Sequence, residues 1–406
     1  MMDERLLNKE KHRCGRNPWT WIPTLYIAEG LPNVIVMAVA VVMYMQLGMS
    51  DSEIGLYTSW LGLPWVIKPF WSPFVDLYKT KRWWVLTMQA LLGSSLAGVA
   101  FTLNASFWFQ GTMFFFFLMA FSSATHDIAA DGYYMLELDD HDQAWYVGIR
   151  NTFYRLAVIF GNGVLVPVAG VLQLTFRNQK AFAWSLVFYG LAGLFIAFWL
   201  YHGFIMPRPA EDKTAKTSAH DVLVGIREMF VTFFSKFPAR QVVFAMLFFL
   251  LYRLPEAMLT KMTATFLLRP NSEGGLGLTP VDYGLANGTV TLPDIVYVWM
   301  SFAMPSSLFV ISACLFVEQF GYGLGFTALT LYMLYYCKGE FKTSHYAICT
   351  GITYLGLMLP GMVSGYLKDA VGYNMFFIII MGLCLVTFAV SAFVRIDPSF
   401  GKKTDL

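Results

Sequence analysis

The chain has 406 residues, of which 57% are hydrophobic, 17% aromatic and only 13% charged. Soluble proteins carry about 25% charged residues, so this composition excludes an ordinary water-soluble globule and indicates a membrane protein. The 28 Lys and Arg residues against 26 Asp and Glu give a net charge of +2, which offers no case for a nucleic-acid partner.

The N-terminal segment is basic and precedes a long apolar run without a small-residue cleavage pattern. We therefore expect an uncleaved first membrane span and not a signal peptide. The five cysteines form no CxxC pair and no regular spacing, so we expect neither a disulfide framework nor a metal site, and no cofactor.

A transmembrane helix needs about 20 mainly apolar residues to cross roughly 30 Å of hydrocarbon. Eleven runs of this kind, bounded by charged or turn residues, predict an all-α polytopic membrane protein. The runs lie at 18–47, 54–76, 83–103, 107–136, 145–173, 181–205, 240–268, 282–304, 308–337, 343–367 and 373–395.

A polar stretch rich in Lys, Pro and Ala separates the sixth run from the seventh. Apolar residues then recur at helical spacing over 222–233, with Arg227 and Lys236 among them, which is typical of a helix lying along the membrane surface. Alternatively, this stretch extends the seventh run. The predicted parts are an N-terminal bundle at 1–206, a cytoplasmic linker with a surface helix at 207–238, and a C-terminal bundle at 239–406.

Lys and Arg gather before the first run, after the second, and between the sixth and seventh, which predicts a cytoplasmic N-terminus. Eleven crossings would then place Lys338 and the basic tail on the far side, whereas twelve would place them inside. We therefore hypothesise that roughly 30 to 45 residues of a parent chain are absent near Val290, within 287–292. A re-entrant segment at this point is the rival explanation.

Ionisable side chains within the apolar runs are candidate functional groups, because each costs about 2.5 to 3.5 kcal/mol at the bilayer centre. Asp127 and Asp131 are four residues apart and so share one helix face, where two carboxyls can carry a proton. The structural alternative is that these are helix-end acids paired with Arg150 or Arg155. We favour a role in proton carriage or substrate binding for Asp127, and the structural role for Asp131.

Further candidates lie in three other runs. Glu29 precedes Gly30 and Pro32, which loosen the helix and favour a cavity wall, although a buried neutral carboxyl is the alternative. Lys68 lies too deep to reach water easily and needs an anionic partner or ligand. In the second half, Arg253 and Glu256 can pair with each other, Lys261 follows on the same run, and Glu318 has no local partner.

No nucleophile elbow, HExxH or phosphate-binding loop occurs in the sequence, so we do not expect an enzyme. Acids and bases spread over both halves instead favour a translocation route.

Specific strings resemble the muropeptide permease (AmpG-like) branch of the major facilitator superfamily, which also includes acetyl-CoA transporters. The second half matches more loosely, and after Asp131 the chain has Gly-Tyr-Tyr where that branch commonly has a basic residue. The strings are Glu-Gly-Leu-Pro at 29–32, Ile-Gly-Leu at 54–56, Gly-Leu-Pro at 62–64, Trp-Ser-Pro at 71–73, and Ala-Thr-His-Asp-Ile-Ala-Ala-Asp at 124–131.

The resemblance implies a major facilitator fold of two six-helix bundles around a central cavity, and proton-coupled uptake of cell-wall sugar-peptides across a bacterial inner membrane. It also implies a cytoplasmic gate made of Asp76, Lys79, Lys81 and Arg82.

We therefore expect a monomeric symporter that imports an amphipathic sugar or sugar-peptide, such as an anhydromuropeptide, during peptidoglycan recycling. Its partners would be protons, the small-molecule substrate and membrane lipid, without nucleic acid. The alternatives are a facilitator or exchanger for an acyl-CoA or oligosaccharide, and a non-transporting membrane enzyme or receptor. The expected proton-coupling residues are Asp127, Asp131 and Glu318, and the expected substrate-binding residues are Glu29, Lys68, Tyr154, Arg155, Arg253 and Glu256.

Overall fold

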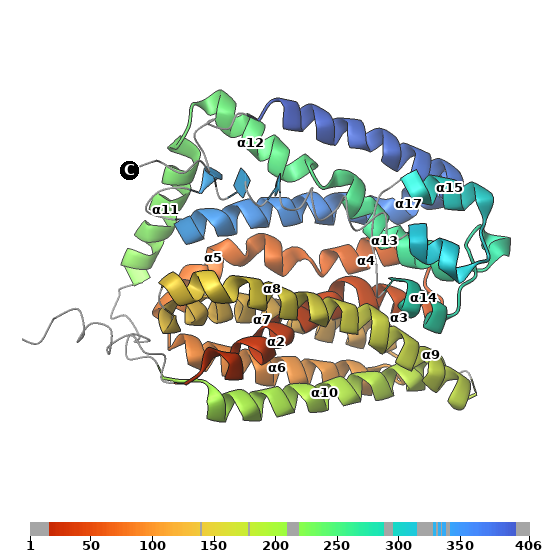
Figure 1. The fold of residues 1–406 in the computed structure, drawn as a ribbon, viewed down its shortest axis with the longest axis horizontal. Helices are drawn as coiled ribbons and strands as arrows, with labels where there is room; N and C mark the ends of the chain where they lie inside the picture. Colours follow the sequence, from red (N-terminus) through yellow and green to blue (C-terminus); the bar gives the residue numbers. More distant parts are fainter. Residues whose placement is uncertain are drawn as a thin grey trace, which may run out of the picture. The chain divides into compact units, whose positions relative to one another are not determined.

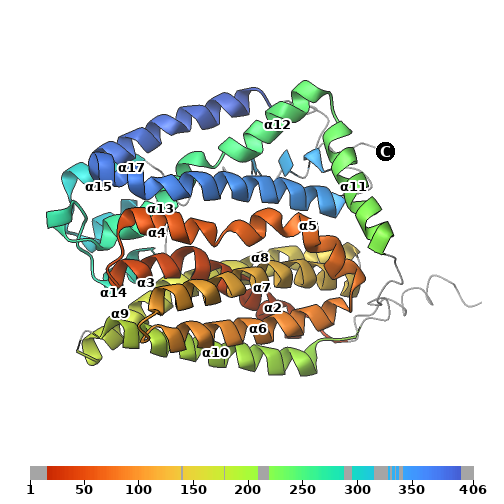
Figure 2. The same cartoon turned by 180° about the vertical axis from the view of Figure 1, so that it is seen from behind.

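The computed structural model describes residues 16–138, 140–177, 179–208, 219–287, 295–314, 328–329, 332–333, 335–337 and 342–394. Helices account for most of these residues, and none of them lies in a strand (Figures 1 and 2). The predicted all-α class is therefore confirmed.

Seven helical stretches in the described part of the chain are long and apolar enough to cross a membrane. The second predicted run is helical as well, as α4 (Asp51–Trp60) and α5 (Leu63–Leu77). The seven stretches are Pro18–Gln46, Lys81–Thr102, Trp108–Glu137, Gly148–Thr175, Lys180–Ile205, Ala239–Leu268 and His345–Ala392.

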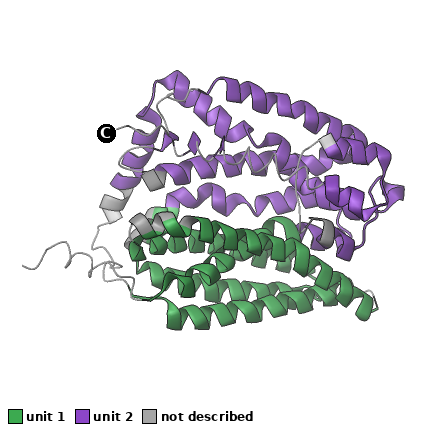
Figure 3. Ribbon diagram, in the orientation of Figure 1, with its two compact units in different colours: residues 1–39, 71–218 green, residues 40–70, 219–406 purple. Residues whose placement is uncertain are grey.

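The chain divides into two compact units, which Figure 3 shows in different colours. Unit 1 contains residues 1–39 and 71–218, and unit 2 contains residues 40–70 and 219–406. The first predicted run therefore contributes its first part to unit 1 and α3 (Ala40–Gln46) to unit 2. The three-part division expected from the sequence is not tested by this grouping and stays a prediction.

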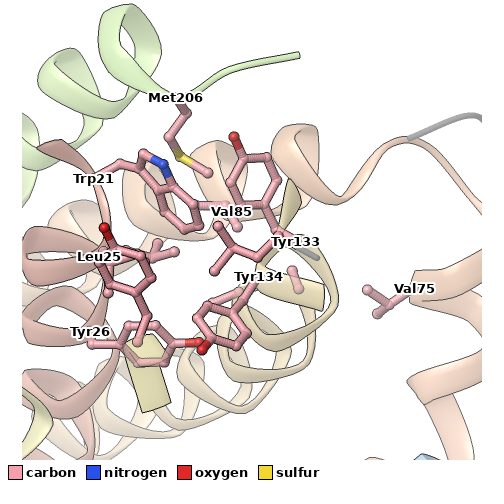
Figure 4. Packing of buried hydrophobic residues seen from close by; sticks show 13 residues of the cluster. Trp21, Leu25, Tyr26, Val75, Val85, Tyr133, Tyr134 and Met206 are labelled. Carbon is pink, nitrogen blue, oxygen red and sulfur yellow. The ribbon is translucent and has the colours of Figure 1, made fainter. Parts of the chain in front are cut away.

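The helices of unit 1 are α2 (Ile22–Val34), α6 (Lys81–Thr102), α7 (Trp108–Glu137), α8 (Asp140–Phe160), α9 (Val166–Thr175) and α10 (Lys180–Ile205), with the end of α5. α6 packs against α7 and α10, while α2 packs against α7 and α8. Figure 4 shows part of the core that joins them, in which the rings of Trp21 and Tyr133 meet edge to face with centroids 5.1 Å apart. This core fixes α2 against α7, and these two helices carry the candidate acids.

Two π-helical turns interrupt unit 1 and lie next to each other, η2 (Ile35–Val39) after α2 and η3 (Gly161–Leu165) after α8. A Cβ at Gly161 would lie 2.6 Å from Val34 Cγ1, so only glycine permits this approach. Such turns are frequent at functional sites. Here they adjoin the helices that carry Glu29 and Arg150.

The helices of unit 2 are α3, α4, the start of α5, α11 (Ala219–Ser235), α12 (Ala239–Leu251), α13 (Leu254–Leu268), α14 (Pro280–Asn287), α15 (Ile295–Ala303) and α17 (Lys342–Ala392). α17 is two helices joined at Gly372, whose φ of +73° is in the left-handed region that favours glycine. These halves match the predicted runs 343–367 and 373–395. α4, α12 and α13 pack on α17.

α11 is a helix separate from α12, because it ends at Ser235 and α12 begins only at Ala239, after Pro238. Figure 1 shows it turned across the ends of α12 and α17. Its Met229 and Phe233 are buried in a core shared with Phe249. The predicted location of this helix on the membrane surface stays a prediction.

The segment predicted to lack part of a parent chain, near Val290, lies outside the described residues. α14 and α15 flank it on either side.

Glycines bring the backbones of α4 and α17 into direct contact. A Cβ at Gly55 would lie 3.1 Å from both the Gly361 carbonyl oxygen and the Gly365 nitrogen. A Cβ at Gly365 would lie only 2.0 Å from the Asp51 carbonyl oxygen. We call Gly55, Gly361 and Gly365 the glycine interface, because no larger residue fits there without moving one of the helices.

Gly365→Val should lower the free energy of unfolding by about 2 kcal/mol or more, because the new side chain would collide with the α4 backbone. Thermal unfolding of the purified protein in detergent, followed by tryptophan fluorescence, measures the effect. Gly382→Val is the matched control, since a Cβ at Gly382, also on α17, meets nothing within 4 Å. Equal melting temperatures for the two variants would contradict the described packing.

Candidate functional site

Three acidic side chains gather around one arginine in unit 1, where α2 packs against α7 and α8. Asp131 Oδ1 lies 2.9 Å from Arg150 Nη2 and accepts a hydrogen bond of 3.2 Å from the Tyr26 hydroxyl. Arg150 also interacts electrostatically with Glu29 and Asp127. We call Glu29, Asp127, Asp131 and Arg150 the acidic cluster.

Glu29 is the buried member of this cluster, with 6% of its surface exposed, and its Oε2 atom has no hydrogen-bond partner. Its carboxyl group is within hydrogen-bonding reach of the Asp127 side chain. Two ionised carboxylates can only accept hydrogen bonds, so a bond between them requires that one carries a proton. The pair can therefore hold a proton inside the protein.

Aromatic rings hold the guanidinium of Arg150 in place. Its Cζ atom lies 4.6 Å from the ring centroid of Tyr26 and 5.2 Å from that of Tyr134. The two rings meet edge to face with centroids 6.0 Å apart. Contact of a cation with a ring face is favourable where water is scarce, so this cage fixes Arg150 opposite Asp131.

A close approach of α2 to α8 places Glu29 beside its neighbours. A Cβ at Gly30 would lie 3.0 Å from the Tyr154 carbonyl oxygen and 3.1 Å from Ala157 Cβ. Tyr154 therefore lies against the turn of α2 that carries Glu29. Arg155 is exposed on α8 and lies outside the acidic cluster, so Arg150 is the arginine that pairs with Asp131.

Four other predicted residues lie in the sequence ranges of unit 2. Arg253 and Glu256 pair with each other through two hydrogen bonds, one of them 2.6 Å from Nε to Oε2. Lys68 is half-buried on the part of α5 that belongs to unit 2. Glu318 lies outside the described residues. Roles for these four residues in transport stay predictions.

Of the residues expected to form a cytoplasmic gate, Asp76 has a side chain outside the described part of the structure. Lys81 is buried and its Nζ donates to the Val75 carbonyl over 3.3 Å. Arg82 donates to two backbone carbonyls at the end of α10. Lys79, with φ of +65°, has its ammonium 5.6 Å from the ring centroid of the residue before it.

A second polar network in unit 1 was not predicted from the sequence. Gln89 contacts His126 Nε2 at 3.1 Å and His202 Nδ1 at 2.9 Å, and His202 Nε2 lies 2.9 Å from the Thr24 hydroxyl. The described residues contain no group of His, Cys, Asp or Glu suited to a metal ion. The network instead joins α2, α6, α7 and α10. The glutamine inside an apolar run indicated a buried polar contact, but the sequence alone does not show which residues it contacts.

Asp51, the first residue of α4, is the centre of an ionic cluster in unit 2 and was also missed. Its side chain is fully buried, and Arg269 donates to Oδ1 over 2.5 and 2.9 Å. Lys368 pairs with Oδ2, to which the Tyr373 hydroxyl also donates over 3.2 Å. An acid at a helix start, directly after the capping residue Ser50, is usually exposed, and only tertiary packing buries this one.

Comparison with known sequences gives one matching family and several relatives. The sequence model described as "BT1 family" matches residues 28–268. The chain is 23% identical to a protein named anhydromuropeptide permease from Escherichia coli K12, with 94% of this chain and 82% of that one aligned. It is 24% identical to a putative transporter, AmpG 4, from Rickettsia felis, covering 89% and 92%. The resemblance inferred from the motifs is therefore confirmed.

Solved structures with the same fold are transporters. A D-xylose-proton symporter superposes with a TM-score of 0.67 at 13% identity, covering 95% of this chain and 99% of its own. A POT family transporter in complex with 5-aminolevulinic acid also gives 0.67, at 11% identity, covering 95% and 97%. The predicted major facilitator fold is confirmed, and the chain is an integral membrane protein.

Asp51→Asn should lower the free energy of unfolding by about 3 kcal/mol, because Arg269 and Lys368 would lose their shared buried anion. Glu273→Gln is the control: Glu273 also pairs with Arg269 but is half-exposed, so its loss should change stability by less than about 1 kcal/mol. Thermal unfolding in detergent at low and high salt measures both. A larger loss for Glu273→Gln than for Asp51→Asn would contradict the described cluster.

Proposed function

Because the chain belongs to the BT1 family, we propose that it is a proton-coupled secondary transporter that imports an amphipathic sugar-peptide such as an anhydromuropeptide. The E. coli and R. felis relatives are named as a permease and a putative transporter, and the solved structures described above are transporters, so movement of a solute across a membrane is the activity that these names share. The proton coupling and the solute are the proposed parts. We propose the bacterial inner membrane as its location, with the N-terminus in the cytoplasm.

The acidic cluster is the observation that supports proton coupling. It contains three carboxyl groups and one arginine, and this arginine, Arg150, forms an ion pair with Asp131. The Glu29 and Asp127 carboxyls interact with each other in this cluster, and a proton shared between them would let one donate to the other. In hydrocarbon the neutral form of such a pair is favoured until water or substrate reaches it. We assign proton carriage to Asp127 with Glu29, and an orienting role to Asp131 with Arg150.

The substrate class is supported by the names of relatives and by the chemistry of the candidate residues. The E. coli relative is named a permease for anhydromuropeptides, solutes that combine sugar and peptide parts. Tyr154 offers a ring for stacking on a sugar, and Lys68, Arg155 and Arg253 offer cations for peptide carboxylates. Closure on the cytoplasmic side is assigned to the basic residues Lys79, Lys81 and Arg82 with Asp76.

The energetics of coupling are sufficient for uptake. One proton that enters down a potential of 100 mV supplies about 2.3 kcal/mol, which is enough to concentrate a neutral solute more than about tenfold. The acidic cluster must then release its proton on the inner side in every cycle.

Asp127→Asn should abolish accumulation driven by a proton gradient, because an amide cannot carry the proton, while leaving exchange of solute between equal pools. The measurement is uptake of a radiolabelled anhydromuramyl tripeptide by liposomes containing the purified protein, with and without an imposed pH gradient. Asp282→Asn is the matched control, since Asp282 lies in the first turn of α14, where its carboxylate accepts a hydrogen bond from the hydroxyl of the capping residue Thr279. It should accumulate the probe like the unmodified protein.

Gradient-driven accumulation that survives in Asp127→Asn would remove the proton assignment. Equilibration of the probe by the unmodified protein without any effect of the gradient would favour a facilitator or exchanger. No flux of the probe in either condition would contradict the proposed substrate.

A further inference from the structure

Lys261 is a buried cation on α13 that the proposed mechanism does not use. It is the eighth residue of the helix Leu254–Leu268, and only 4% of its surface is exposed. Seven residues separate it from the end of the span, a depth of about 10 Å at 1.5 Å per residue. An ammonium group at this depth is costly and normally meets an anion.

No anion meets Lys261 among the residues that the structure describes. Its Nζ donates one hydrogen bond, 3.1 Å long, to the Thr58 hydroxyl, which itself donates to the Ile54 carbonyl. Asp51 and Glu256, carboxylates on the two helices that meet here, are already engaged. Asp51 is held by Arg269, Lys368 and Tyr373, and Glu256 is held by Arg253.

A second donor beside Lys261 is unused as well. The Ser59 hydroxyl is buried, with 1% of the residue exposed, and its oxygen has no hydrogen-bond partner. A Cβ at Gly361 would lie 2.6 Å from Ser59 Oγ and 3.5 Å from Lys261 Cγ. The Ser59 and Lys261 side chains therefore both pass next to Gly361. An ammonium and a free hydroxyl around a glycine form a small donor site suited to a carboxylate.

We propose that Lys261 and Ser59 bind a carboxylate of the transported solute, and that they become accessible when α4 moves away from α17. Ser59 comes from α4, Gly361 from α17 and Lys261 from α13, so the site lies behind the glycine interface. Small residues let the two backbones meet closely here, and opening this contact would also release Asp51 of α4 from Lys368 and Tyr373 of α17. This inference rests on the proposed function, because it names the charge that the carried solute must bear.

The experiment compares two probes, an anhydromuramyl tripeptide with free carboxylates and the same molecule with its carboxylates converted to amides. Binding of each to the purified full chain is measured by calorimetry. The unmodified protein should bind the acid at least tenfold more tightly than the amide. Lys261→Met should remove this preference and leave the amide affinity within about twofold, whereas Lys261→Arg should keep it. Lys180→Met, at the exposed start of α10, is the control and should keep it.

A second measurement, thermal unfolding of the Lys261 variant, does not depend on the identity of the substrate. Without ligand, Lys261→Met should raise the melting temperature by about 2 °C or more, because an unpaired buried charge is replaced by an apolar side chain of similar length. A structural lysine would show the reverse.

A lowered melting temperature for Lys261→Met, or an acid preference that survives in this variant, would overturn the proposal. If the unmodified protein binds neither probe, the proposed substrate fails while the melting temperature still decides the role of Lys261.

Discussion

The hydrocarbon of a membrane cannot solvate charge, and this constraint governs every functional group in the chain. Each ionisable side chain within a span must find a counter-ion, a hydrogen bond, a proton or a ligand. In unit 1, Arg150 is held by Asp131 and two tyrosine rings. In unit 2, Asp51 is enclosed by Arg269, Lys368 and Tyr373. In both clusters protein groups neutralise the buried charge.

Other groups sit in clusters whose charges do not balance. Glu29 and Asp127 belong to a cluster with three carboxyls and one arginine, where a shared proton would let the two carboxyls bond to each other. Lys261 is the opposite case, a cation that is held by one hydroxyl. The first arrangement suits a species that enters as H⁺, and the second suits an anionic solute. A transporter that couples proton entry to uptake of an anion needs both a carboxyl that can take up a proton and a cation that can receive the anion.

Breaks in helical regularity position these groups. Pro32 and the π-turn after it loosen α2 beyond Glu29, and Gly30 lets α8 approach so that Tyr154 lies beside it. In unit 2 the glycine interface allows the α4 backbone to touch α17. Irregular backbone is tolerated at membrane depth only where protein or a cavity covers it. The break in α2 accordingly lies beside the buried Glu29.

The sequence by itself determined the membrane class, the helical runs and the candidate acids, because hydrophobicity and helical spacing are local properties that need no partner. It also identified the motif carrying Asp127 and Asp131. Only the tertiary structure decided that Arg150 and not Arg155 pairs with Asp131, and that Asp51 is buried. Those choices depend on which face of one helix meets another, and the packing of distant segments sets that geometry.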